Sequence, residues 1–279
     1  MVCERGSGDA RLGGAVRIGV VPNRVREAAV RFTRNLIAEA RSRGWEVWVD
    51  EGEGADLSDE PTDLVIATGG DGTMLRAVSL AYRADRPVLG FNLGTLGFLA
   101  EADPGDLSRT LDRLEQGEYR LVPRMTVMAE LNGLSDLGVN DVVVEKIDSQ
   151  RLIELEVEVD SEPMLSYRAD GLVISTPTGS TAYSFSAGGP LLDTRVDALV
   201  MTPVAPHSLF SRSLVLSPES VIRCRVARDR PVQVSVDGRT TASLGMGDEV
   251  VVRRGPRPVM FVAFERVAFS TVVTERFGL

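Results

Sequence analysis

Short, wholly apolar runs alternate with helix-like segments over the first 120 residues of the chain. Runs without polar alternation are typical of strands in a parallel sheet that helices cover on both faces. Between two of these runs, apolar residues recur at helical spacing as far as Gly44, a common helix stop. The alternation predicts a Rossmann-like parallel α/β domain. We expect its strands at VRIGVV (16–21), WEVWV (45–49), DLVIAT (63–68) and PVLGFN (87–92).

The pattern changes near Tyr119, where short β-like runs separated by turn signals replace the alternation. Asp237-Gly238 in SVDGRT is one such signal, and it predicts a hairpin turn. We therefore expect an N-terminal α/β domain over 1–121 and a β-rich, β-sandwich-like domain over 122–261. The last residues, 262–279, contain a helix-like run and are predicted to pack back on the N-terminal domain.

The chain is acidic, with 40 aspartates and glutamates against 31 lysines and arginines, a net charge of −9. This balance argues against nucleic acid or an anionic membrane as a partner. The sequence has no apolar run of membrane-spanning length, and its N-terminus lacks the apolar core of a secretion signal. We therefore expect a cytoplasmic protein. Two cysteines and one histidine are too few for a zinc-type cluster.

The stretch ATGGDGTMLRA (67–77) places three glycines and one carboxylate between a predicted strand and a predicted helix. A helix N-terminus carries unpaired backbone N–H groups and partial positive charge, which suit a phosphate group. Glycine lets the backbone approach an anion closely. The turn lacks the G-K-[ST] of a nucleoside-triphosphate P-loop. Our candidate phosphate-binding residues are Gly69, Gly70, Gly72 and Thr73.

Asp71 is unexpected in such a turn, because a carboxylate repels phosphate. Its presence is explained if it binds a metal ion or takes a proton from an attacking hydroxyl, two tasks of a phosphoryl-transfer site. The alternative is a simple helix cap. Asp71 is our candidate catalytic residue.

Two segments of the chain resemble a known family. GGDGT (69–73) resembles the signature shared by NAD kinases, diacylglycerol-type lipid kinases and phosphofructokinases. DGLVISTPTGSTAYSFSAGGP (170–190) closely resembles the nucleotide-binding block of NAD kinases. The resemblance covers about residues 16–265. Further matches, in the family's chain order, are GFNLGTLGFL (90–99), Asn140-Asp141 in GVNDVVVEK and TPVAPHSL (202–209).

The resemblance implies roles for individual residues. Asp71 matches the aspartate that acts as base on the 2′-hydroxyl of the adenosine ribose. Asn140 and Asp141 match the pair that holds adenine and its ribose, with Asp141 one methylene shorter than the more common Glu. Asp170, Ala182 and Ser186 match positions towards the nicotinamide end. The full set of expected dinucleotide-binding residues is Gly72, Asn140, Asp141, Asp170, Thr178, Thr181, Ala182, Tyr183, Ser186 and Ala205.

The resemblance also implies the reaction NAD⁺ + ATP → NADP⁺ + ADP in a homodimer or homotetramer. ATP and inorganic polyphosphate both remain open as the phosphate donor, and NADH remains open as an acceptor. Lys146 is the sole lysine, so we expect a divalent ion, Mg²⁺ or Mn²⁺, to neutralise the donor phosphates.

Three alternatives share part of this pattern. A lipid kinase would need an apolar acceptor cleft, and a phosphofructokinase-like enzyme would need a basic cluster for a sugar phosphate. A non-catalytic dinucleotide sensor is the third, although Asp71 argues against it. His207, the only histidine, is expected to be a structural loop residue rather than a general base.

Overall fold

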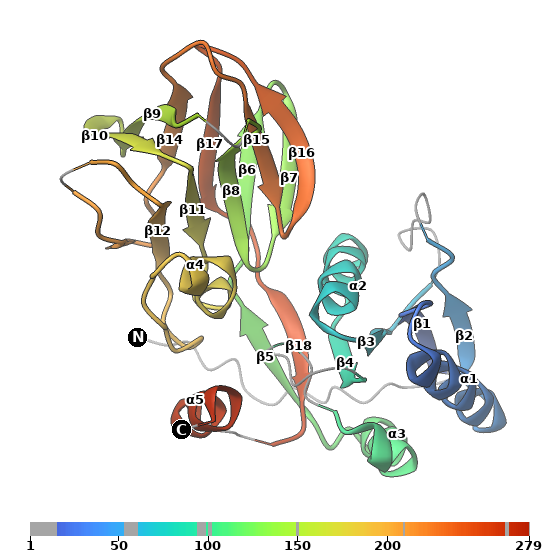
Figure 1. The fold of residues 1–279 in the computed structure, drawn as a ribbon. Coiled ribbons are helices and arrows are strands. Elements are labelled where there is room, and N and C mark those ends of the chain that lie inside the picture. Colours follow the sequence, from blue (N-terminus) through green and yellow to red (C-terminus); the bar gives the residue numbers. More distant parts are fainter. Residues whose placement is uncertain are drawn as a thin grey trace. The chain divides into compact units, whose positions relative to one another are not determined.

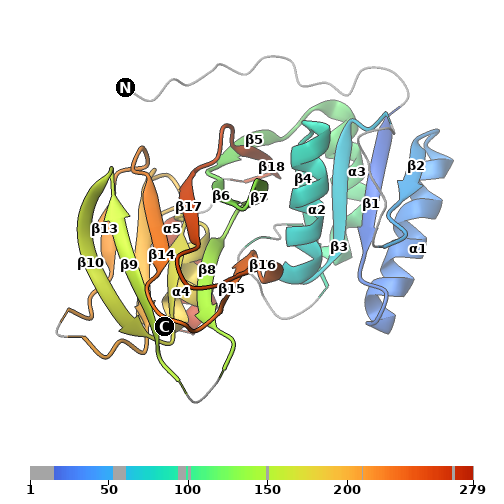
Figure 2. The ribbon, with the colours of Figure 1, turned by 90° about the horizontal axis from the view of Figure 1, so that it is seen from above.

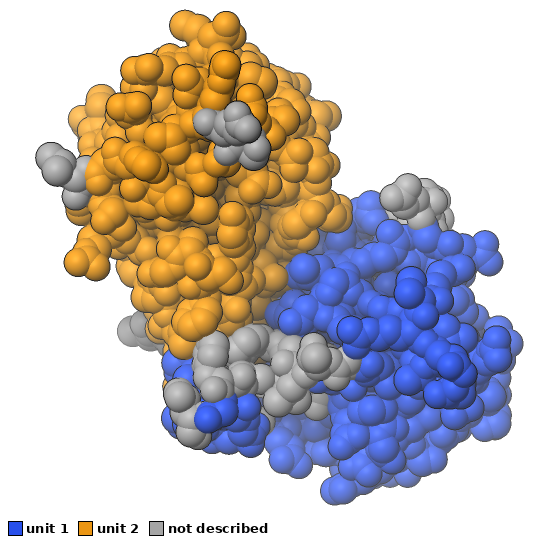
Figure 3. All heavy atoms as spheres, viewed as in Figure 1, with its two compact units in different colours: residues 1–123, 259–279 blue, residues 124–258 orange. Residues whose placement is uncertain are grey.

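The computed structural model describes residues 16–52, 61–93, 99, 102–148, 151–208, 210–265 and 268–278. The chain divides into two compact units, residues 1–123 with 259–279 and residues 124–258 (Figure 3). Figure 1 follows the chain through both. The chain enters the second unit at Arg124 and returns to the first at Val259, so the first unit is built from both ends of the sequence.

The first unit contains a six-stranded sheet in the order β2-β1-β3-β4-β18-β5, and Figure 2 shows β1, β2 and β3 side by side. Its strands are β1 (Arg17–Pro22), β2 (Glu46–Val49), β3 (Leu64–Gly69), β4 (Val88–Asn92), β5 (Arg120–Arg124) and β18 (Val259–Ala263). Its helices are α1 (Glu27–Ser42), α2 (Asp71–Ala84), η2 (Pro104–Asp106), α3 (Leu107–Gln116) and α5 (Phe269–Phe277).

The first four strands pair in parallel, as the alternation predicted. β1 pairs with β2 and with β3, and β3 pairs with β4. Every residue of β3 is buried, which is why its sequence has no polar alternation. The glycine-rich turn follows β3 directly and so lies at the carboxyl end of that strand. This is the edge at which open α/β sheets bind ligands.

Helix α1 covers the sheet with one apolar face. Phe32 and Leu36 are buried on that face, and the ring of Phe32 lies 4.9 Å from that of Phe91 in β4. After the helix, Gly44 has a φ of 81°, a conformation that glycine adopts without strain. None of the helices in the described ranges is long and apolar enough to cross a membrane.

The C-terminal residues complete the first unit. β18 pairs in parallel with β4, through Phe261 and Val88, and α5 follows it. The helix expected in the last residues is therefore present. β5 belongs to this sheet as well, so the change of sequence pattern near Tyr119 precedes the change of unit at Arg124.

The second unit consists of two six-stranded sheets, in the orders β10-β9-β14-β17-β6-β7 and β13-β12-β11-β8-β15-β16. The first of these contains β6 (Val127–Leu131), β7 (Leu134–Gly138), β9 (Ile153–Val159), β10 (Glu162–Ala169), β14 (Ile222–Val226) and β17 (Glu249–Arg254). The other contains β8 (Asp141–Lys146), β11 (Gly171–Ser175), β12 (Leu199–Val204), β13 (Leu214–Leu216), β15 (Val232–Val236) and β16 (Arg239–Leu244). Two short helices, η3 (Gly179–Thr181) and α4 (Tyr183–Ser186), follow β11.

The two sheets share one apolar core. Val127 of β6 and Leu155 of β9 belong to the same buried cluster as Val142 of β8 and Ile174 of β11. Such a shared core is the packing of a β-sandwich. The prediction of a β-rich, sandwich-like second part is confirmed.

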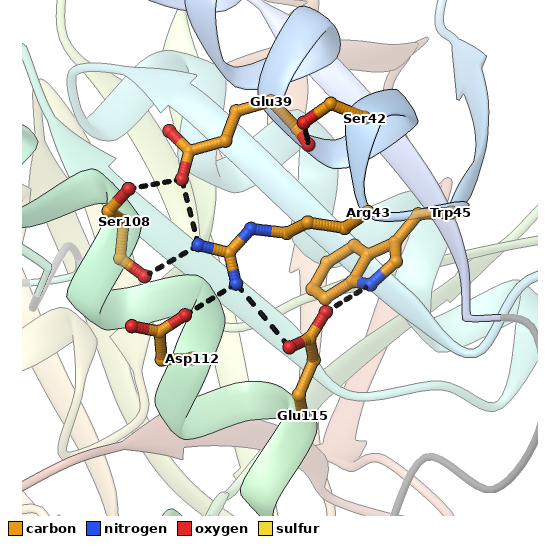
Figure 4. Close-up of polar contacts among 7 residues, drawn as sticks. All are labelled: Glu39, Ser42, Arg43, Trp45, Ser108, Asp112 and Glu115. Carbon is orange, nitrogen blue, oxygen red and sulfur yellow. Dashed lines mark hydrogen bonds and ion pairs between the residues drawn. The ribbon is translucent and has the colours of Figure 1, made fainter.

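Arg43 ties α1 to α3 in the first unit (Figure 4). Its guanidinium donates to Glu39 at 2.9 Å, to Asp112 at 2.6 Å and to Glu115 at 3.4 Å. Glu115 also accepts a hydrogen bond from the indole of Trp45 at 2.9 Å. The Arg43 side chain is 18% exposed, so solvent screens these interactions only in part.

We expect Arg43→Ala to lower the free energy of unfolding by about 1–2 kcal/mol, because one largely buried guanidinium serves three carboxylates. Urea denaturation measures the change. Arg31→Ala is the matched control, since Arg31 and Glu27 form an ion pair on the same helix whose side chains are 63% and 84% exposed. That control should cost less than about 0.5 kcal/mol. Equal losses in the two variants would contradict the interpretation.

Candidate active site

The glycine-rich turn joins β3 to α2 in the first unit. Gly70 is the N-cap residue, and its carbonyl accepts hydrogen bonds at 3.0 Å from the N–H groups of Thr73 and Met74. The preceding two N–H groups, those of Asp71 and Gly72, lie in the first turn, where helix geometry provides no intrahelical carbonyl for them. The turn therefore offers donors and the positive end of a fourteen-residue helix to an anion.

The three glycines of this turn differ in what surrounds them. A Cβ on Gly69 would lie 2.3 Å from Thr73 Oγ1 and 3.0 Å from Asn23 Cβ, so packing accounts for that glycine. At Gly70 and Gly72, an added Cβ would meet no atom of the described residues within 4 Å, apart from its nearest neighbours in the chain. These two glycines therefore border open space, as the approach of a ligand to the backbone requires.

The Asp71 carboxylate has one oxygen to which the described residues donate no hydrogen bond. Its Oδ1 is buried and has no hydrogen-bond partner within the described part of the chain. Because Gly70 occupies the N-cap position, Asp71 begins the helix and is not its cap, which corrects the simple-cap alternative. A buried polar atom without a partner is costly, so this oxygen is an acceptor that a bound molecule could satisfy.

Asn140 and Asp141 lie at the start of β8 in the second unit, and both are buried. Thr176 holds this segment from one side, since its N–H donates to Asn140 O at 2.9 Å and its hydroxyl donates to Val139 O at 2.5 Å. Gly179 packs on the same backbone, where an added Cβ would lie 2.0 Å from Asn140 O. The loop after β11 thus fixes the pair that sequence predicted to hold adenosine.

The predicted residues of the 178–186 loop become more exposed to solvent along the chain. Thr178 is buried, and its carbonyl accepts a hydrogen bond at 3.1 Å from the hydroxyl of Thr181, which is half-buried. Ala182 is half-buried as well, whereas Tyr183 and Ser186 on α4 are exposed. The loop therefore offers the aromatic rings of Tyr183 and Phe185 and several hydroxyl groups, without charge, to a ligand.

Asp170 lies at the opposite end of the same strand pair. β8 and β11 are antiparallel, with Asp141 opposite Ser175 and Glu145 opposite Gly171, so roughly 15 Å of strand separates Asp141 from Asp170. The Asp170 carboxylate accepts a hydrogen bond from Lys146 Nζ at 2.6 Å, a partnership that the sequence did not indicate. This separation suits an elongated ligand with two recognition ends.

Carboxylates at both ends of this strand pair act on the hydroxyl of Tyr183. Burial, and then the negative charges of Glu145, Asp170 and Asp141, raise the pKa of its hydroxyl. Tyr183 is therefore within electrostatic reach of both predicted ligand-binding carboxylates. The structure thus gathers the predicted residues of the second unit around β8, β11 and α4.

Two further predicted residues follow β12. Ala205 has a φ of 44°, a left-handed conformation that alanine rarely adopts. The backbone N–H of His207 donates to Arg168 O at 2.7 Å, and its side chain is exposed. The backbone hydrogen bond anchors this loop position, and a structural role for the His207 side chain stays a prediction. Residues 94–98 and Leu209, which belong to two of the family-like segments, lie outside the described residues.

Asp237 has a second role besides its turn, and the sequence did not indicate it. Asp237 and Gly238 have φ values of 49° and 73° in the β15–β16 hairpin, so the predicted turn is confirmed. However, Asp237 is also half-buried, and its charge acts on Asp141. Burial, and then the charge of Asp237, raise the pKa of Asp141 to about 7. The turn signal alone could not reveal this contact, because it depends on the pairing of β15 with β8.

The raised pKa of Asp141 predicts a pH-dependent stability. The folded chain binds this proton more tightly than the unfolded chain, so the stabilisation is full below about pH 4 and is lost as the pH rises through about 7. Asp141→Asn should therefore be more stable than the wild type at pH 8, by about 1–3 kcal/mol, with the difference vanishing towards pH 4. Thermal unfolding across this pH range tests it. The control is Asp106→Asn, at an exposed carboxylate, whose stability should change with pH as that of the wild type does. A gain in the stability of Asp141→Asn that does not depend on pH would contradict the raised pKa of Asp141.

The described ranges contain no group of three or more His, Cys, Asp or Glu side chains that could hold a metal ion. A separate hollow of about 480 Å³ lies over the β6–β7 turn and the start of β17, and none of the predicted site residues lines it. The predicted site residues therefore fall into two groups, each described within its own unit. One is the turn before α2 in the first unit, and the other is the surface around β8, β11 and α4 in the second.

Comparison with known proteins identifies the family. Residues 18–119 match the ATP-NAD kinase N-terminal domain, and residues 139–264 match the ATP-NAD kinase C-terminal domain. The chain belongs to the ATP-NAD kinase family. Its two matched domains include all the predicted site residues, from the GGDGT turn to Ala205.

Relatives in this family align over most of the chain. NAD kinase 2 of Streptomyces avermitilis is 39% identical over 275 residues, which cover 91% of each chain. The NAD kinase of Moorella thermoacetica is 38% identical, and the alignment covers 93% of this chain and 88% of the relative. Yeast NADH kinase complexed with NADH has a similar structure, with a TM-score of 0.84 and 27% identity over 95% of this chain and 88% of its own. An NAD kinase from Archaeoglobus fulgidus, solved with ATP, shares the fold with a TM-score of 0.73, 24% identity and coverage of 94% and 98%.

Proposed function

We propose that this chain transfers the terminal phosphoryl group of ATP to the 2′-hydroxyl of the adenosine ribose of NAD⁺, making NADP⁺ and ADP. Its membership of the ATP-NAD kinase family supports this reaction. The observation that carries the mechanism is the buried Oδ1 of Asp71, for which the described residues supply no partner. The accepting hydroxyl of the ribose would be that partner.

In the proposed step, the ribose oxygen forms a bond to the terminal phosphorus while the bond from phosphorus to the bridging oxygen breaks. ADP leaves with that electron pair, and Asp71 accepts the hydroxyl proton. Because the transition state of phosphoryl transfer is loose, the hydroxyl needs positioning more than early deprotonation. The N–H groups of Asp71 and Gly72 at the start of α2 are suited to stabilise the transferred phosphoryl group.

Residues of the second unit bind and orient the dinucleotide in this proposal. Asn140 and Asp141 hold adenine and its ribose, and Asp170 acts towards the nicotinamide end, together with Ala182 and Ser186. Orientation of this kind can lower a reaction barrier by several kcal/mol, on the order of 7 or more in the best cases. The remaining proposed contacts are Thr178, Thr181, Tyr183 and Ala205 from the second unit and Gly72 from the turn.

We propose that a divalent ion, Mg²⁺ or Mn²⁺, arrives with the phosphate donor. The described residues contain no three-ligand cluster, which fits an ion held mainly by phosphate oxygens and water. When bound, such an ion neutralises negative charge on the donor phosphates. The residues of this chain then orient the acceptor and receive its proton.

One assay tests this function. The purified chain is incubated with NAD⁺, ATP and Mg²⁺, and NADP⁺ is detected with an NADP-specific dehydrogenase. We expect steady production of NADP⁺. Binding of NAD⁺ without any product would favour a dinucleotide sensor, and phosphorylation of a lipid or a sugar phosphate instead would favour the other two kinases that carry a GGDGT turn.

Two variants of this assay test the phosphate donor and the acceptor, which family membership does not decide. Polyphosphate in place of ATP tests the donor, and NADH in place of NAD⁺ tests the acceptor. We also propose a homodimer or homotetramer, which light scattering after gel filtration would measure, and a cytoplasmic location, which fractionation of the source cells would test.

A further inference from the structure

Asp237 is a half-buried residue whose carboxylate has no task in the proposed chemistry. Its Oδ1 accepts hydrogen bonds from the N–H of Asn140 at 2.8 Å and, more weakly, from that of Asp141 at 3.3 Å. Its Oδ2 accepts from the N–H of Val139 at 2.9 Å. Both oxygens are therefore directed at three consecutive backbone N–H groups. These three donors oppose the effect of burial, which raises the pKa of Asp237.

The surrounding backbone is built to admit this carboxylate. A Cβ on Gly138 would lie 2.6 Å from Asp237 Oδ1, so glycine at that position makes room for the approach. The N–H of Asp237 also donates to Asp141 O at 3.0 Å, which closes the contact in the other direction. Asp237 thus binds the 139–141 backbone from the β15–β16 hairpin. Thr176 and Gly179 contact the same backbone from the loop after β11.

We infer that Asp237 is a positioning residue for NAD⁺ binding, which holds the backbone of Asn140 and Asp141 in the geometry that receives adenosine. This inference rests on the proposed roles of Asn140 and Asp141. Consecutive N–H groups converge on one anion only when the backbone bends around it, and hydrogen bonds to a charged acceptor are stronger than those to a neutral one. Removing the carboxylate therefore frees the segment that carries both side chains.

Asp237→Asn in the full chain tests this inference, because the amide keeps the shape of the side chain but loses the charge and one acceptor. One of the three N–H groups then faces an NH₂ group. We expect the KM for NAD⁺ to rise about tenfold, while the KM for ATP stays within about twofold of the wild type. Amide hydrogen exchange of residues 139–141 should become faster.

Asp237→Gly provides a second variant, since glycine suits the positive φ of the hairpin but removes every side-chain acceptor. Its KM for NAD⁺ should rise at least as much. Asp136→Asn is the matched control, because Asp136 on β7 binds Arg239 and Thr241 instead of the 139–141 backbone. It should leave both KM values unchanged.

Three outcomes would overturn the inference. They are an unchanged KM for NAD⁺ in active Asp237 variants, parallel rises in both KM values, and a loss of stability or kcat without any change in KM. The last would mark Asp237 as purely structural. A wild-type chain that binds NAD⁺ but makes no NADP⁺ would reject the proposed function instead, so the two failures are distinguishable.

Discussion

Asp71→Asn should lower kcat by about two to four orders of magnitude, the usual worth of a positioned general base. Asparagine keeps the size of the side chain but cannot accept the proton of the ribose hydroxyl. The KM for NAD⁺ should change little, because the proposed adenine and nicotinamide contacts come from Asn140, Asp170 and the 181–186 loop. Steady-state kinetics with ATP and NAD⁺ measure both quantities.

The same variant separates catalysis from helix stability. Asp71 begins α2, so loss of its charge at the positive end of the helix should cost only about 0.3–1 kcal/mol. Asp85→Asn is the control, because Asp85 is an exposed carboxylate at the other end of α2 with a φ of 54°, a conformation that asparagine tolerates. It should keep kcat within about twofold. Near-normal kcat in Asp71→Asn would remove Asp71 from the proposed mechanism.

Gly179→Ala should lower kcat/KM for NAD⁺ by about a hundredfold, the scale of loss from a displacement of about 1 Å in a positioned group. The added methyl carbon would lie 2.0 Å from Asn140 O and 2.5 Å from its carbonyl carbon, which are backbone atoms that cannot rotate away. Relief requires the Asn140 backbone to move and the hydrogen bond from Thr176 to break. We also expect a loss of about 1–3 kcal/mol in the free energy of unfolding from overpacking.

Gly245→Ala is the matched control for Gly179→Ala in the same unit. An added Cβ there would meet Asp248 Oδ2 at 3.7 Å, an ordinary van der Waals distance. Its kinetics and unfolding should stay close to those of the wild type. If Gly179→Ala binds NAD⁺ as tightly as the wild type, the close packing of Gly179 on Asn140 is not required for the site.

Features that depend only on neighbouring residues could be predicted from the sequence. The apolar run of β3 predicted a strand buried on both faces, and that strand is fully buried. The Gly-Gly-Asp-Gly turn predicted a helix start at the carboxyl end of that strand, and α2 begins at Asp71. Asp237-Gly238 predicted its hairpin turn. These signals are local, because periodicity and turn chemistry act over a few residues.

Which of these residues come into contact depends on the tertiary structure. It separated Gly69, which Thr73 crowds, from Gly70 and Gly72, which border open space, although all three look alike in the sequence. It brought Asp237 to the 139–141 backbone across 96 to 98 positions of the chain. Such contacts follow from the register in which β15, β8 and β11 pair. That register is set by the burial of whole strand faces in a shared core, which no short stretch of the sequence encodes.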